Sequence, residues 1–154
     1  MTDTRSIVPS FPRRTLLLGG TALLAVAAGA AYVRRDRFAG DEMTPPEILD
    51  AVRAGSLLLV DIRRPDEWDE TGLAEGAVPL DMRRDDFADA LAELVNGDLS
   101  APVALICARG VRSDRTSARL AEAGFTRIVD VPEGMLGSSA GPGWLERGLP
   151  VVRP

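Results

Sequence analysis

One cysteine stands at the end of an apolar run, directly before a loop that contains glycine and two arginines. Cys107 follows 104–106, and the loop 108–112 leads into a helix that we expect to begin at Ser113. Loop N–H groups, the positive end of the helix and the nearby arginines all favour a thiolate. The pattern predicts a nucleophilic Cys107, and the weaker interpretation is an inert core cysteine.

The composition removes most other ways of activating this sulfur. The 154-residue sequence has no histidine and one cysteine. It therefore holds no Ser-His-Asp triad, Cys-His dyad, histidine-ligated metal site or intrachain disulfide. We expect neither a metal nor a cofactor. A net charge of −5 argues against a nucleic-acid partner, which would require a basic stripe.

Strand and helix patterns alternate along residues 43–153. Apolar runs at 57–62, 103–106 and 127–131 are typical of strands buried on both faces. Parallel strands separated by helices predict one α/β domain, a parallel sheet flanked by α-helices. Ligands of such sheets bind beyond the carboxyl ends of the strands, where Cys107 stands.

Four helices are expected between these strands. The first runs from Thr44, an N-cap with Glu47 three residues later, to about Arg53. The others cover 65–70, 85–94 and 113–123. In the helix over 85–94 the pattern places one apolar set on the buried face, and the acids Asp85, Asp86 and Asp89 opposite in water. That apolar set is Phe87, Ala90, Leu91 and Leu94.

Residues 1–37 have a different character and are predicted to form a targeting or transmembrane segment, with 38–42 as a linker. The first 37 residues carry six arginines and two aspartates, whereas 38–154 are strongly acidic. The stretch 15–33 has no charge and would span about 28 Å as a helix, close to a bilayer core. A signal with a cleavage site at 28–30 and a permanent anchor both fit.

The arginine pair before this stretch resembles a twin-arginine export signal. Arg13 and Arg14 precede Thr15-Leu16-Leu17, although the serine and lysine usual in that signal are absent. The resemblance implies a periplasmic domain, exported or anchored facing the periplasm, with membrane contact through 15–33 unless it is cleaved. An anchor with a cytoplasmic domain is the alternative, because three arginines flank each side.

The cysteine loop resembles the active-site loop of rhodanese-like sulfurtransferases, whose cysteine carries a persulfide. Further motifs occur in the family's order at 58–68, 124–135 and 144–151, so the resemblance covers most of 43–153. Three departures are present: 72–77 lacks the family's histidine, Gly134 stands alone where paired glycines are usual, and 138–143 is an insertion.

This resemblance implies a sulfurtransferase that moves sulfane sulfur from thiosulfate or a related donor to a thiol or cyanide through a Cys107 persulfide. The persulfide-binding loop would be Ala108, Arg109, Gly110, Val111, Arg112 and Ser113. The partners would be a small sulfur donor and a thiol acceptor. A non-catalytic or sulfur-carrying module that binds a protein partner is the alternative.

Loop length argues against a third reading, phosphatase or arsenate reductase. Cys107 and Arg112 enclose four residues, whereas phosphatases of the same fold enclose five, because phosphate needs a wider cradle.

Three residues before the loop are expected to support it. In the family, Asp61 and Arg63 mainly tie a strand end to its neighbours, although a catalytic pair is the alternative. Glu67 matches a family acid that can hold the loop arginine, here Arg112; otherwise it is a solvated helix acid. Arg109 is expected to bind a thiosulfate dianion, and the alternative is an exposed arginine without a binding role.

Overall fold

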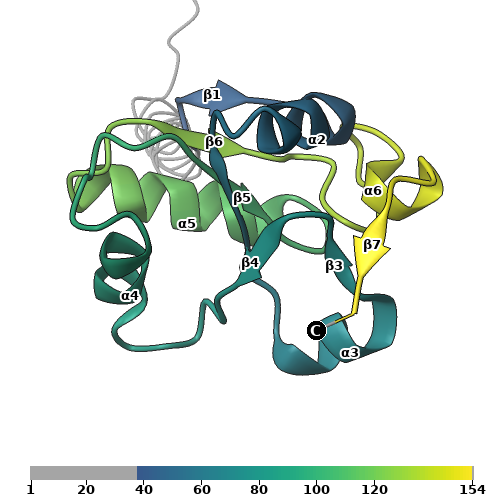
Figure 1. The fold of residues 1–154 in the computed structure, drawn as a ribbon, viewed down its shortest axis with the longest axis horizontal. Helices are drawn as coiled ribbons and strands as arrows, with labels where there is room; N and C mark the ends of the chain where they lie inside the picture. Colours follow the sequence, from purple (N-terminus) through teal and green to yellow (C-terminus); the bar gives the residue numbers. More distant parts are fainter. Residues whose placement is uncertain (1–37, 154) are drawn as a thin grey trace, which may run out of the picture. The chain divides into compact units, whose positions relative to one another are not determined.

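The computed structural model describes residues 38–153, which form a five-stranded parallel sheet with helices on both faces (Figure 1). The strand order is β1-β6-β5-β2-β4, and every neighbouring pair is parallel. A separate antiparallel pair joins β3 to β7. The strands are β1 (Asp41–Glu42), β2 (Leu58–Asp61), β3 (Leu73–Ala74), β4 (Ala77–Pro79), β5 (Val103–Ile106), β6 (Ile128–Asp130) and β7 (Val151–Val152). The predicted α/β class is confirmed.

Two hydrophobic clusters fill the space between the sheet and its helices. One cluster packs α4 (Phe87–Leu94) and α5 (Val111–Glu122) against one face of the sheet. The other packs α2 (Pro45–Arg53) and α6 (Gly143–Glu146) against the opposite face. Alternate residues of β5 belong to the two clusters, as expected for a strand covered on both sides. The short α3 (Pro65–Thr71) follows β2.

The start of α2 follows the capping pattern of its sequence. The Thr44 backbone N–H and the Thr44 hydroxyl both donate to Glu47 Oε2, at 2.8 and 2.6 Å. These contacts fix the first turn of α2, whose Ile48 and Leu49 are then buried against the sheet.

Three details differ from the expectations. Helix α5 begins at Val111 rather than Ser113, because Gly110 takes a left-handed conformation and caps the helix two residues earlier. Leu94 is 41% exposed, and Val95, at 8%, fills the buried position instead, because α4 ends at Leu94 and the backbone turns away there. The expected linker 38–42 contains β1, which pairs with β6.

No helix within residues 38–153 is both long and apolar enough to cross a membrane. The predicted apolar segment 15–33 and the arginine pair before it lie outside the described residues.

Candidate active site

The carboxyl ends of β2, β5 and β6 lie at one edge of the parallel sheet, and the candidate site is built there. Cys107 directly follows β5 and is 1% exposed. Strand β2 pairs with β5, which brings the segment after Asp61 next to the one after Ile106. The edge therefore brings together two segments that the sequence analysis selected independently.

The backbone of a second loop holds the cysteine loop in place. Met135 N–H donates to Cys107 O and Leu136 N–H donates to Ala108 O, both at 2.8 Å. Gly134 has a φ of +66°, and a Cβ there would stand 2.6 Å from Ala108 O. The two backbones approach so closely that the single glycine at 134 is required for this contact.

The Cys107 sulfur faces the beginning of α5. Cys107 Sγ donates to Ser113 Oγ at 3.5 Å, and Ser113 Oγ donates to Gly110 O at 3.0 Å. The N–H groups of Val111, Arg112 and Ser113 are the first three of α5, so they have no acceptor within the helix. This helix end offers donors and partial positive charge to an anion on the sulfur.

Arg112 is fixed by Glu67 from α3. Arg112 Nη1 donates to Glu67 Oε2 at 2.7 Å, and Nη2 donates to Oε1 at 2.6 Å. The pair lowers the pKa of Glu67 to about 2, mainly through the Arg112 hydrogen bonds. Glu67 chiefly raises the pKa of Arg112, and Cys107 raises it further. A fixed positive charge therefore acts on the sulfur.

Asp61 and Arg63 form a buried network behind this edge. Arg63 is 1% exposed, and its guanidinium donates to both Asp61 oxygens at 2.7 to 3.0 Å. It also donates to Gly72 O and Thr71 Oγ1, both at 2.7 Å, and to Glu67 O at 3.2 Å. The network joins the end of β2 to both ends of α3, which presents Glu67 to Arg112.

Arg109 lies at the exposed rim of the cysteine loop. Its Nη1 donates to Gly137 O at 3.2 Å, so its guanidinium reaches toward the inserted segment 138–143. The two residues are 28 positions apart, and no sequence pattern predicts their contact. The site thus brings Cys107, Arg112, Ser113 and Glu67 together and leaves Arg109 at its border.

Glu133 organises the inserted segment, a role that the sequence analysis missed. Its carboxylate is 2% exposed and accepts from Gly143 N–H at 2.9 Å and from the Arg147 guanidinium at 2.7 and 2.8 Å. The Arg147 hydrogen bonds lower the pKa of Glu133. One feature of the sequence could have indicated this role. An acid, Glu133, directly precedes Gly134, at the place where the family usually has two glycines.

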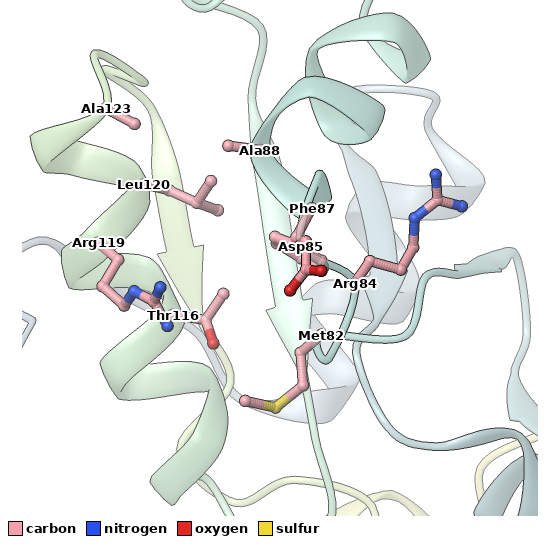
Figure 2. Close-up of a pocket in the computed structure, with 9 residues that line it drawn as sticks. All are labelled: Met82, Arg84, Asp85, Phe87, Ala88, Thr116, Arg119, Leu120 and Ala123. Carbon is pink, nitrogen blue, oxygen red and sulfur yellow. The ribbon is translucent and has the colours of Figure 1, made fainter.

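A cleft of about 220 Å³ lies between α4 and α5 and is separate from the cysteine loop (Figure 2). Met82, Phe87 and Leu120 give it apolar walls, and the Arg84 and Arg119 side chains lie at its border. None of the predicted site residues lines it. Within residues 38–153, moreover, no cluster of cysteine and acidic side chains is placed to hold a metal ion.

Comparison with known proteins agrees with this geometry. The rhodanese-like domain family matches residues 44–140, which is well over half of the chain and includes Cys107 and Arg112. The chain belongs to the rhodanese-like domain family. The chain is 32% identical over 129 residues to the probable adenylyltransferase/sulfurtransferase MoeZ of Mycobacterium tuberculosis. That alignment covers 83% of this chain and 31% of the relative.

A second curated relative and a solved structure extend the comparison. The tRNA uridine(34) hydroxylase of Chlamydia trachomatis is 30% identical over 101 residues, covering 63% of this chain and 30% of the hydroxylase. The chain thus spans about a third of the length of these relatives. The polysulfide-sulfur transferase of Wolinella succinogenes has the same fold, with a TM-score of 0.59, 23% identity, and coverage of 82% of this chain and 88% of that one.

Proposed function

We propose that this rhodanese-like domain is a sulfurtransferase that takes sulfane sulfur from thiosulfate or a related donor. The observation that carries the proposal is the placement of Cys107 Sγ at the first turn of α5, beside an arginine that Glu67 holds in place. The first turn supplies free N–H donors, and the arginine supplies positive charge. Both favour an anionic sulfur.

The first half of the cycle loads the sulfur. The Cys107 thiolate attacks the outer sulfur of thiosulfate, and a bond forms between Sγ and that sulfur. The sulfur–sulfur bond of thiosulfate breaks, and its electron pair leaves with sulfite. The resulting persulfide carries one negative charge on its outer sulfur, which the N–H groups at 111–113 would hold, as an oxyanion hole does.

The second half returns the enzyme to its thiolate form. A thiolate or cyanide attacks the outer sulfur of the persulfide, the bond to Sγ breaks, and Cys107 keeps the electron pair. Cys107 begins and ends each cycle as a thiolate, so the chain needs no histidine base to remove a proton from it. Arg109, at the border of the loop, would bind the donor dianion.

A mass measurement tests the loading step. Incubation of the purified protein with thiosulfate is expected to add one sulfur atom, about 32 Da, and cyanide is expected to remove it with formation of thiocyanate. Cys107→Ser, which keeps the size of the side chain, serves as the matched control and should stay unmodified and inactive. Turnover by the serine variant would refute the mechanism.

A sulfur-carrying module that serves a protein acceptor is the second candidate, favoured by an apolar border around the loop. Val111, within the loop, is 60% exposed. Leu136, whose N–H donates to Ala108 O, is 41% exposed. Loading by thiosulfate without turnover on cyanide would favour this candidate. Steady cyanide turnover would favour the free enzyme.

We also propose export of the domain, on the resemblance of 12–17 to a twin-arginine signal and the uncharged stretch 15–33. The domain would then act in the periplasm or facing it. A double substitution of the arginines, described in the Discussion, tests this route.

A further inference from the structure

Arg109, the residue proposed above to bind the donor dianion, has one hydrogen-bond partner within residues 38–153. Its Nη1 donates to Gly137 O at 3.2 Å. The side chain is long and exposed, so this contact decides where the guanidinium stands. The remaining N–H groups of the guanidinium stay available to an anion, because the group has five donors. The position of Gly137 O therefore sets the position of the charge at the border of the loop.

Gly137 is packed backbone to backbone against the end of the inserted segment 138–143. A Cβ at Gly143, where φ is +81°, would overlap the Gly137 nitrogen. A Cβ at Gly137, where φ is +83°, would stand 2.6 Å from Pro142 O. Both positions need glycine, for space and for the left-handed backbone. Because the two stretches of backbone are in direct contact, Gly137 can shift only if Pro142 and Gly143 shift with it.

Glu133 holds Gly143 through its buried carboxylate. Gly143 N–H donates to Glu133 Oε2 at 2.9 Å, and the Arg147 guanidinium donates to both carboxylate oxygens at 2.7 and 2.8 Å. Arg147 chiefly lowers the pKa of Glu133, so the carboxylate is charged at neutral pH. Within the described residues no hydrogen bond joins Glu133 to the cysteine loop. The carboxylate therefore acts on the inserted segment.

We propose that Glu133 is a positioning residue for Arg109 and so determines how well the site accepts an anionic sulfur donor. The Glu133 carboxylate holds Gly143, which packs on Gly137. Gly137 O in turn holds the Arg109 guanidinium. The inference deepens the proposed function: it rests on donor binding by Arg109 and names the residue that keeps the guanidinium in place.

The direction of the effect separates positioning from a simple effect of charge. Glu133→Gln removes a negative charge, which by itself would make the site more attractive to an anion. If the carboxylate positions Arg109, the same substitution releases the guanidinium and makes the site less attractive to an anion. The two explanations therefore predict changes of opposite sign.

Alkylation of Cys107 by two reagents measures this attraction without requiring sulfur transfer. Iodoacetate is an anion and iodoacetamide is neutral, and both react with the same thiolate. The ratio of their rates, followed by intact mass at one neutral pH, therefore cancels any change in the thiolate fraction. We expect Arg109→Gln to lower the ratio of iodoacetate to iodoacetamide about threefold, and Glu133→Gln to lower it about twofold. An unchanged or raised ratio in Glu133→Gln overturns the proposal.

A second variant displaces the carboxylate and keeps every charge. A Cβ at Gly141 would stand 2.5 Å from Glu133 Cδ, so Gly141→Ala should push the carboxylate away from Gly143 and also lower the ratio. The atoms that the new Cβ meets are the end of a flexible side chain, so this variant should fold even if Glu133→Gln does not. Glu146→Gln, an exposed acid on α6, is the matched control and should leave the ratio unchanged. An equal fall in the control would overturn the proposal.

A double variant shows whether the effect passes through Arg109. In an Arg109→Gln background, Glu133→Gln should cause no further fall in the ratio. A further fall of about twofold would mean that Glu133 acts by another route, against the proposal. In steady-state turnover, Glu133→Gln should raise KM for thiosulfate and change kcat by less than about twofold. Absence of sulfur loading together with the expected alkylation ratios would refute only the proposed function.

Discussion

Replacing Glu67 by glutamine should lower the free energy of unfolding of the protein by an amount that depends on pH. The pKa of Glu67 falls from 4.5 to about 2 on folding, chiefly through the two Arg112 hydrogen bonds. At 1.36 kcal/mol per unit this corresponds to about 3 kcal/mol of stability at neutral pH. Glutamine keeps the shape and one acceptor, so we expect Glu67→Gln to lower the free energy of unfolding by about 2 kcal/mol.

The sign of the pH dependence follows from the lowered pKa. A carboxyl group whose pKa is lower in the folded state adds stability above its unfolded value, and that stability is lost as the pH falls toward about 2. The difference between the natural chain and Glu67→Gln should therefore be constant above about pH 6. It should shrink to less than half at about pH 3.

Urea unfolding at pH 7 and pH 3 measures this difference. Glu70→Gln, an exposed acid on the same helix, is the matched control and should change the free energy of unfolding by less than about 0.5 kcal/mol. Sulfur transfer by Glu67→Gln should also fall, because Arg112 is no longer held toward the loop. An equal loss of stability at both pH values would contradict the ion-pair reasoning.

Three other outcomes are expected. Arg63→Ala leaves a buried carboxylate unpaired and should lower the free energy of unfolding by about 3–5 kcal/mol in urea. Gly134→Ala places a Cβ against Ala108 O at a left-handed φ, so we expect a loss of about 2 kcal/mol and slow persulfide formation by mass spectrometry. Arg13→Lys with Arg14→Lys keeps the charge but removes the planar guanidinium pair, and the protein should stay in the cytoplasm on fractionation. Unchanged export of that double variant would favour an ordinary signal anchor.

The sequence predicted the parts of the fold that carry a strong local signal. Strand β5 is wholly apolar, and β2 and β6 are apolar up to a final aspartate. Helix α2 is marked by Thr44 and Glu47 at capping distance. Strands β1, β3 and β7 are two residues long, too short for any periodicity, and they exist only because a partner strand lies beside them. They could be found only in three dimensions.

The site shows the same division between local and distant signals. Cys107 and Arg112 are visible as a motif, but the start of α5 was misplaced, because Ser113 looks like an N-cap in sequence. In the structure its hydroxyl instead contacts Gly110 O and the sulfur. Asp130 lies within the predicted strand 127–131, where an acid is expected to face water, so only the packing of α5 on β6 reveals its burial.

The contacts between residues 134–137 and the cysteine loop have a consequence for the nascent chain. Synthesis runs from the N-terminus, so Cys107 is made about 30 residues before Gly137, which takes roughly two to six seconds. During that interval the thiol has neither the backbone contacts at Met135 and Leu136 nor the shelter they create. A chain with a second cysteine could form a non-native intrachain disulfide during this interval. Cys107 is the only cysteine of this sequence, so its early exposure cannot lead to a non-native intrachain disulfide.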